Sequence, residues 1–115
     1  MSDIKELIRK IRIFRDKRDW KQFHNPKDSA IALLSEATEV LDLFKWRNSK
    51  ELDIYAKEKK KEIGDELSDV LYWVLLMAHD LKIDLPKAFE EKMKENEKKY
   101  PIEKVKGKHT KYNKL

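Results

Sequence analysis

Two pairs of acidic residues have the types and the spacing needed to hold a hard metal ion together. The first pair is Glu36 and Glu39, and the second is Glu66 and Asp69. In each pair the residues are three positions apart, which places both side chains on one face of a helix. Four further acidic pairs in this chain have the same spacing. Because such pairs usually mark a solvated helix face, spacing alone does not identify a site.

Position on the helical wheel separates these two pairs from the other four. Each pair lies at the edge of the apolar face of its own helix, which we expect to be core. These faces consist of Ala30, Leu33, Leu34, Ala37, Val40, Leu41 and Phe44 on one helix and of Ile63, Leu67, Val70, Val74, Met77 and Leu81 on the other. The acids belong to stripes with the i, i+4, i+7 spacing of a packed seam. The stripes are Ala32-Glu36-Glu39-Leu43 and Glu62-Glu66-Asp69-Trp73. If the two helices are antiparallel neighbours, four carboxylates converge where little water is present. Such a group of like charges is unfavourable unless protons or cations compensate it.

The chemistry of these side chains indicates which cation would compensate them. Neither stripe contains lysine, arginine, histidine or cysteine. A set of oxygen ligands selects a hard cation, so we expect Mg²⁺, with Mn²⁺ as a possible substitute, rather than Zn²⁺. Since Mg²⁺ commonly bridges carboxylates and substrate phosphates, a metal site here indicates phosphate chemistry. The alternative at this point is that the acids are ordinary surface residues.

Composition limits the kind of protein that must position these residues. The chain has 115 residues and a mass of 13.9 kDa, which fits a single domain spanning residues 1–115. Its 40% hydrophobic content is too high for a disordered chain, although 43% of residues are charged. The absence of cysteine excludes disulfides and thiolate metal sites. The longest apolar run, residues 70–78, is too short to span a membrane, so we expect a cytoplasmic protein with no membrane partner.

Hydrophobic periodicity predicts an all-α fold with four helices. They span about residues 2–22, 26–46, 49–81 and 84–100. We expect Ser2 to cap the first helix, Asn25 and Pro26 to begin the second, and Asp84 to begin the last, which Pro101 ends.

Short connections predict that these helices form an antiparallel four-helix bundle. The sequence between residues 49 and 61 is the least regular part, where a loop or a break in the third helix is the alternative. The apolar faces are wide for one small bundle, so we expect a homodimer or a homotetramer. After the bundle, residues 101–115 form an extended basic tail with five lysines and one glutamate.

Six short motifs follow one another along the chain. They are Arg18-Asp19-Trp20-Lys21-Gln22-Phe23-His24-Asn25-Pro26, Glu36-x-x-Glu39, Phe44-Lys45-Trp46, Glu66-Leu67-Ser68-Asp69-Val70, Lys92-Met93-x-x-Asn96-x-x-Lys99-Tyr100-Pro101 and Lys111-Tyr112. In this order they resemble the MazG-like all-α nucleoside triphosphate pyrophosphohydrolases, and within that superfamily the dCTP pyrophosphatase branch. The resemblance covers residues 14–112. One departure is Trp73, where that branch usually has tyrosine.

The resemblance implies an enzyme that uses Mg²⁺ to hydrolyse nucleoside triphosphates or their deoxy forms to the monophosphate and pyrophosphate. Such enzymes clear unwanted nucleotides, and the branch implies a preference for dCTP-like or modified nucleotides. The metal ligands would be Glu36, Glu39, Glu66 and Asp69, with Glu36 also orienting the attacking water. The residues implied to bind substrate are Trp20, His24, Trp46, Trp73 and Asn96 at the base, and Lys108 and Lys111 at the phosphates. Glu62 would be an outer or additional ligand.

A basic helical module that binds nucleic acid or a protein partner without catalysis is the alternative function. It is favoured by the formal charge of +5 and the pI near 9.3. It gives no reason for acids inside apolar stripes, and no helix has the Arg- and Asn-rich face of a major-groove reader. We therefore expect a nucleoside triphosphate, and not nucleic acid, to be the main ligand.

Overall fold

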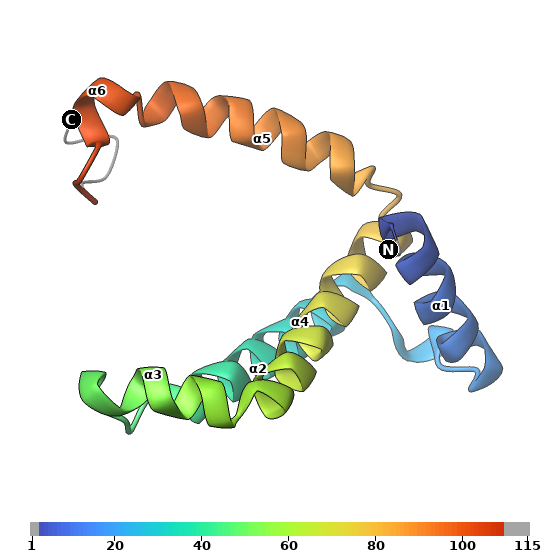
Figure 1. Cartoon of the computed structure of the whole chain (residues 1–115). Helices are drawn as coiled ribbons and strands as arrows, with labels where there is room; N and C mark the ends of the chain where they lie inside the picture. The colour runs from blue at the N-terminus through green and yellow to red at the C-terminus, as the bar shows by residue number, and fades with distance from the viewer. Residues whose placement is uncertain (1–2, 110–115) are drawn as a thin grey trace. The chain divides into compact units, whose positions relative to one another are not determined.

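The computed structural model describes residues 3–109, and the regular elements within that range are all helical. Six α-helices and one short 3₁₀ helix form (Figure 1). They are α1 (Ile4–Lys17), the 3₁₀ helix η1 (Lys21–Phe23), α2 (Pro26–Phe44), α3 (Ser49–Glu58), α4 (Lys60–Asp80), α5 (Leu85–Lys99) and α6 (Ile102–Val105). The predicted all-α class is therefore confirmed. None of these helices has the length and apolar character needed to cross a bilayer.

Side-chain caps fix where several helices begin. The Asn25 side chain accepts a hydrogen bond from the Asp28 N–H at 2.9 Å, and Pro26 occupies the first turn of α2. Asp84 caps α5 in the same way through the Lys87 N–H. The sequence prediction is correct for both of these starts.

Other helix boundaries differ from the prediction. The first helix ends at Lys17 rather than near residue 22, because Asp19 adopts a positive φ of 55°, which a right-handed helix cannot contain. Its cap is Asp3, which accepts from the Glu6 N–H at 2.8 Å, whereas the predicted cap, Ser2, lies outside the described residues. The predicted third helix is interrupted at Lys59, within the segment where a break was the stated alternative, so α3 and α4 are separate helices.

The chain divides into two compact units, Met1–Lys82 and Ile83–Leu115. The first unit contains α1 to α4, and the second contains α5 and α6. The expectation of one domain with a four-helix bundle therefore stays a prediction.

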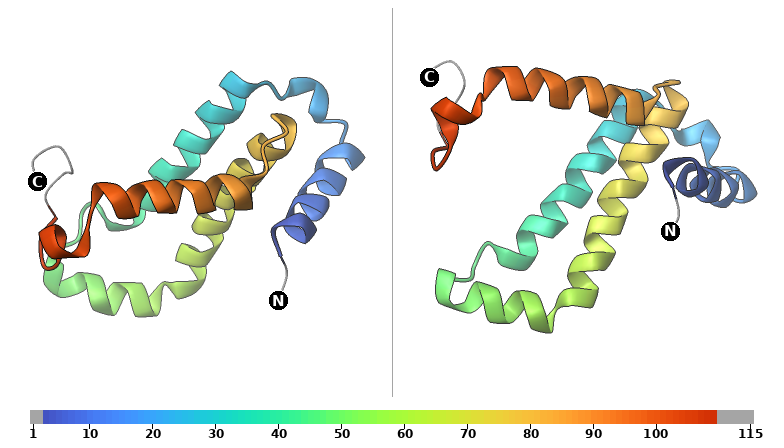
Figure 2. Two further views of the ribbon diagram at one scale, coloured as in Figure 1. Left: turned by 90° about the horizontal axis from the view of Figure 1, so that it is seen from above. Right: turned by 45° about the horizontal axis from the view of Figure 1, so that its top comes forward.

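An antiparallel helix pair organises the first unit. Helices α2 and α4 lie side by side and run in opposite directions, with α3 joining one end of the pair (Figure 2). Helix α1 packs against α4. The most buried apolar side chains, Leu75, Leu76 and Ala78, all belong to α4. The core of this unit therefore lies along α4, the helix that both α1 and α2 contact.

Only part of the face of α2 that the wheel predicted as core is covered, namely Leu33, Val40 and Phe44, which are half-buried. Leu34 and Leu41 were expected to be buried, yet Leu34 is 69% exposed and Leu41 is 58% exposed. On α4, the predicted core residue Leu67 is also exposed. The physical reason is that α4 is the main neighbour of α2, so only one side of α2 is covered. The covered side is the one that carries Glu36, which is half-buried.

Candidate functional site

The antiparallel pairing of α2 and α4 gathers four carboxylates. Glu36 and Glu39 come from α2, and Glu66 and Asp69 come from α4. One carboxylate oxygen of each residue lies within 4.8 Å of those of the other three. Glu36 and Glu66 are half-buried, whereas Glu39 and Asp69 are exposed. The structure thus brings together the two acidic pairs that the wheel selected.

Neighbouring acids and burial raise the pKa values of two of these carboxyl groups, Glu36 and Glu66. A hydrogen bond with Glu39 is the largest of the effects that raise the pKa of Glu36 to about 7, followed by burial and by the charges of the other acids. Burial is the main effect that raises the pKa of Glu66, with further contributions from Glu39. Glu36 therefore keeps its proton to a higher pH than an isolated carboxyl group would.

The residues of the cluster fit a hard divalent cation. Within residues 3–109, the buried Oε2 atoms of Glu36 and Glu66 have no hydrogen-bond partner. Leaving a buried acceptor unsatisfied is costly, and a cation between the two helices would satisfy both atoms at once. The donors are all carboxylate oxygens, which Mg²⁺ and Mn²⁺ prefer over the nitrogen and sulfur donors typical of Zn²⁺ sites.

Other acids on the same helices form ion pairs at the surface. Asp42 forms an ion pair with Lys45 at 2.8 Å, and Asp65 forms one with Lys61 at 2.8 Å. Glu62 is exposed and is not one of the four clustered acids. Its predicted role as an outer or additional ligand stays a prediction.

An aromatic cavity of about 270 Å³ adjoins the acidic cluster. Its walls are formed by Phe14, Trp20, His24, Asp69, Tyr72 and Trp73. The rings support one another edge to face, with centroids 5.7 Å apart for Phe14 and Trp20 and 5.3 Å apart for His24 and Trp73. Because Asp69 belongs to both features, a flat ring held in this cavity would lie next to the carboxylates.

A known protein family matches the part of the chain that carries this site. The sequence profile described as the MazG-like family matches residues 31–115, a range that contains all four clustered acids. This chain belongs to the MazG-like family. The resemblance seen in the sequence motifs is therefore confirmed.

Individual relatives agree with this assignment. The dCTP pyrophosphatase 1 of Rattus norvegicus is 35% identical, over 100% of this chain and 67% of its own length. The dCTP pyrophosphatase 1 of Homo sapiens is 32% identical with the same coverage. A pyrophosphatase from Archaeoglobus fulgidus is 35% identical, with a TM-score of 0.82 and a match covering 88% of this chain and 94% of that chain. This MazG-like chain is a nucleotide pyrophosphohydrolase.

The predicted substrate-binding residues of the MazG-like chain lie in different places. Trp20, His24 and Trp73 line the aromatic cavity. Trp46 does not line it and is 86% exposed, with the Lys45 Nζ atom 5.5 Å from its ring centroid. Asn96 belongs to α5, in the second unit.

The two lysines predicted to bind phosphates are not placed at the site. Lys108 belongs to the second unit, and Lys111 lies outside the described residues. Their roles, like those of Trp46 and Asn96, stay predictions.

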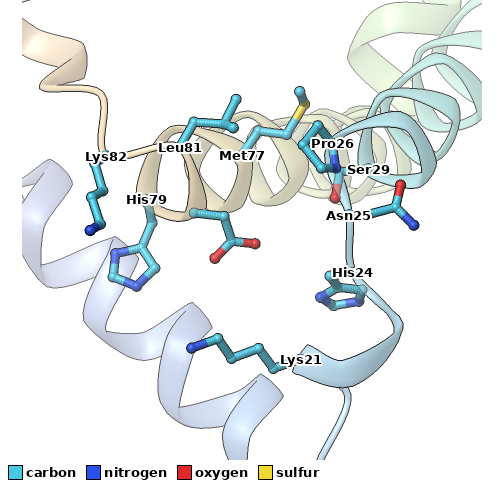
Figure 3. A pocket seen from close by; sticks show the side chains of 10 residues that line it. Lys21, His24, Asn25, Pro26, Ser29, Met77, His79, Leu81 and Lys82 are labelled. Atoms are coloured by element: carbon cyan, nitrogen blue, oxygen red, sulfur yellow. The ribbon is translucent and has the colours of Figure 1, made fainter.

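A second cavity, of about 410 Å³, lies beside the start of α2 and the end of α4 (Figure 3). Its lining includes Lys21, Ser29 and Lys82. His24 lines this cavity as well as the aromatic one. The imidazole of this histidine is therefore part of the wall that the two cavities share.

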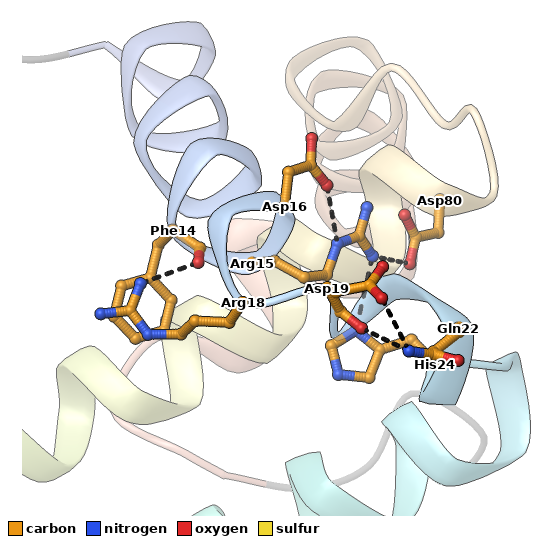
Figure 4. A network of polar contacts seen from close by, with 8 residues as sticks. All are labelled: Phe14, Arg15, Asp16, Arg18, Asp19, Gln22, His24 and Asp80. Atoms are coloured by element: carbon orange, nitrogen blue, oxygen red, sulfur yellow. Dashed lines mark hydrogen bonds and ion pairs between the residues drawn. The ribbon is translucent and has the colours of Figure 1, made fainter.

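Sequence reasoning missed an ion pair next to His24. Arg15 is only 1% exposed, and its Nη1 donates a hydrogen bond to the Asp80 carboxylate at 2.7 Å (Figure 4). The available signal was the criterion that selected Glu36, because Arg15 lies four residues after Ile11 on the apolar face of α1. Asp80 similarly follows Leu76 by four residues. The cavity residues Phe14 and Tyr72 were also missed, since aromatic side chains at helical spacing are usually core.

Proposed function

We propose that this MazG-like enzyme hydrolyses nucleoside triphosphates or deoxynucleoside triphosphates to the monophosphate and pyrophosphate, with Mg²⁺ as cofactor. The observation that carries the proposal is the convergence of four carboxylates beside an aromatic cavity. The biological role would be removal of unwanted nucleotides from the cytoplasmic pool. The names of the rat and human relatives favour dCTP or a modified relative of it as the preferred substrate.

The four clustered acids would hold the metal ion, and each has a distinct environment. When bound, Mg²⁺ would neutralise phosphate charge and lower the pKa of a bound water. Glu36, one of these ligands, would also orient the attacking water. Glu62, one helical turn before Glu66, would act outside the first set of ligands.

The base and the phosphates would be bound by different parts of the chain. The indole rings of Trp20 and Trp73 would stack on the base, and the His24 imidazole would form a hydrogen bond to its edge. Trp46 and Asn96 would complete the base pocket. Lys108 and Lys111 would neutralise charge on the departing pyrophosphate.

A second copy of the chain would cover the apolar surface that one copy leaves exposed. Leu34 and Leu41 on α2, and Leu67 and Leu71 on α4, are all exposed large hydrophobic residues. Contiguous apolar surface of this kind favours association between copies. We therefore propose a homodimer or a homotetramer, and we propose that the four-helix bundle expected from the sequence forms within it.

A nucleotide panel tests the proposed reaction. The parent chain is incubated with Mg²⁺ and each common nucleoside and deoxynucleoside triphosphate, and the products are separated by ion chromatography. We expect a monophosphate and pyrophosphate in equal amounts. Release of orthophosphate instead, or no turnover of any nucleotide, would contradict the proposal.

Substitutions in the cluster test whether the acids carry the reaction. Glu39→Gln and Asp69→Asn each remove one negative charge with little change of shape. We expect each to lower kcat/KM by roughly 100-fold or more, because changes around metal ligands typically cost about 10–100-fold even in the outer shell. The matched control is Asp42→Asn, which changes an acid on α2 outside the cluster. Full activity in both cluster variants, with circular dichroism unchanged, would rule out this site.

A further inference from the structure

Arg15 is a buried cation whose contacts converge on the aromatic cavity. Its guanidinium is bound by Asp80 at 2.7 Å, and Asp16 lies 3.9 Å from its Nε atom. The same Nη1 atom that meets Asp80 lies 3.5 Å from Nδ1 of His24 (Figure 4). The pairing with Asp80 links α1 to the end of α4, so the guanidinium is held in one place.

The contact between Arg15 and His24 restricts where the imidazole carries its hydrogen. A guanidinium donates hydrogen bonds and accepts none. Facing the guanidinium at 3.5 Å, this imidazole nitrogen is favoured as an acceptor, without hydrogen. In the neutral ring the hydrogen then sits on Nε2. Among the described residues, no group accepts a hydrogen bond from that Nε2–H, so it is free to meet a ligand.

Charge at this position also favours the neutral ring. Burial lowers the pKa of His24, and the positive charge of Arg15 lowers it further, against a smaller opposing effect of Asp80. An edge-to-face contact with Trp73, at 5.3 Å between ring centroids, supports the imidazole from the cavity side.

The backbone of Arg15 holds a second residue of the same cavity. Its carbonyl oxygen accepts a hydrogen bond from the Trp20 N–H at 3.2 Å. This bond closes the turn in which Asp19 has its positive φ. One residue thus fixes both Trp20 and His24, the two cavity residues that lie between α1 and α2.

We propose that Arg15, anchored by Asp80, is a positioning residue that keeps His24 as the Nε2–H tautomer and so makes it a hydrogen-bond donor to the substrate. The inference rests on the proposed function only in naming a nucleotide as the substrate. It adds a rule for substrate specificity, because a hydrogen-bond donor at this place can pair only with a substrate atom that has a lone pair. The substrate group at His24 is therefore an acceptor, such as the carbonyl oxygen or unprotonated ring nitrogen of a pyrimidine.

The tautomer is measured directly by nitrogen NMR on the full-length chain. Long-range proton–nitrogen spectra of uniformly labelled protein at pH 7.5 distinguish a protonated from an unprotonated ring nitrogen, and His24→Gln assigns the signals. We expect an unprotonated Nδ1 and a protonated Nε2 in the parent. Arg15→Met should give a mixture of tautomers, and Arg15→Lys, which keeps a donor, should restore the parent pattern at least in part.

Two further variants keep the result interpretable. Arg9→Met removes an arginine ion pair from the exposed side of α1 and should leave the His24 signals unchanged. Asp80→Asn keeps the Arg15 guanidinium as donor but weakens the ion pair that anchors it, so it should shift the tautomer ratio less than Arg15→Met does. It also provides the test if Arg15→Met does not fold. A parent protein with hydrogen on Nδ1, or an Arg15→Met variant and an Asp80→Asn variant that both keep the parent tautomer, would overturn the proposal.

Kinetics with dCTP as the probe separate positioning from general structural damage. Losing one neutral hydrogen bond predicts a rise in KM of roughly fivefold for Arg15→Met, with kcat little changed. Arg15→Lys should recover most of this loss. An equal fall in kcat in the Arg15 and Arg9 variants would indicate a structural effect and overturn the assignment. If the parent hydrolyses no nucleotide, the proposed function fails, while the NMR result still decides the tautomer.

Discussion

The clustered acids repel one another in the folded protein unless positive charge neutralises them. Glu36 and Glu66 are forced together by the packing of α2 against α4, although each carboxylate alone would be better solvated in water. Protons supply this positive charge at low pH, and a bound divalent ion would supply it at higher pH. Stability and metal binding should therefore be linked to pH through the same residues.

Without metal, the protein should lose stability as the pH rises. The pKa of Glu36 is about 7 in the folded chain, above its ordinary value of 4.5, so the folded state binds more protons between these values. The free energy of unfolding then decreases as the pH increases through this window. Melting temperatures measured in EDTA should fall between about pH 4.5 and 7.

The Glu36→Gln variant provides the comparison for this pH dependence. It cannot release the proton, so its melting temperature should change less over the same window. Glu58→Gln, an exposed acid at the end of α3, should behave like the parent. The lowered pKa of His24 adds an opposite slope to parent and variant alike, so the comparison between them decides. An equal pH dependence of the melting temperature in the parent and in Glu36→Gln would show that Glu36 does not hold this proton.

Addition of Mg²⁺ at pH 7.5 should raise the melting temperature. An ion that binds only the folded state stabilises it by about 2.7 kcal/mol when present at 100 times its dissociation constant. Differential scanning fluorimetry with and without millimolar MgCl₂ measures the shift. Glu39→Gln should reduce the shift strongly. Equal shifts in parent and variant would place the ion elsewhere.

At the level of single residues, the sequence was informative where a side chain broke the pattern of its own helix. Glu36 could be found because an acid among apolar residues is unusual, and this mismatch can be seen in the sequence of a single helix. Arg15 broke the same pattern, but its partner Asp80 is 65 residues away and only the tertiary structure reveals it. The link from Arg15 to His24 likewise depends on the turn around Asp19, whose positive φ the sequence does not specify.

Among the elements, α2 is the one whose first residues connect the aromatic cavity to the acidic cluster. Its cap, Asn25, directly follows His24, so the cap connects the aromatic cavity to the helix that carries Glu36 and Glu39. An error in the start of α2 would displace the imidazole from the cavity wall.

Removal of this cap should affect both stability and activity. Asn25→Ala should lower the free energy of unfolding by about 1 kcal/mol, the usual value of an N-cap, as measured by urea denaturation. The matched control is Asn48→Ala, which removes the corresponding cap of α3 through the Glu51 N–H. Both should cost similar stability, but only Asn25→Ala should raise KM. A raised KM in the Asn48 variant alone would contradict this account of α2.

Helix starts were more predictable than helix ends. Asn25 with Pro26, and Asp84, are cap signals within a few residues of sequence, so local chemistry decides them. The interruption at Lys59 has no cap side chain of its own, and it occurs within a run of lysines that fits a helix equally well. Such a break follows from where α3 and α4 must point, which is a tertiary requirement.

For the whole molecule, the exposed leucines indicate how copies would associate. A helical wheel shows which face of a helix is apolar. It does not show whether the surface that packs against this face comes from the same chain or from another copy. That is why Leu34 was predicted to be core and is exposed in the single chain.

A charge on this surface should break the oligomer. Sedimentation velocity of the parent should give the mass of a dimer or a tetramer. Leu34→Glu should shift it to the monomer, because burying an unpaired carboxylate outweighs the association. The control Lys27→Glu also adds negative charge to α2, at an exposed polar position, and should leave the mass unchanged. A monomeric parent at micromolar concentration would refute the proposed assembly.

The location of the core has a consequence for how folding and ligand binding are coupled. In the described part of the chain, the fully buried apolar side chains, Leu75, Leu76 and Ala78, all lie in the last third of α4. The segments of α2 and α4 that bear the carboxylates contribute none of these buried apolar side chains. An ion bound between them would act there as a non-covalent cross-link, so metal binding would complete the site and stabilise this helix pair at the same time.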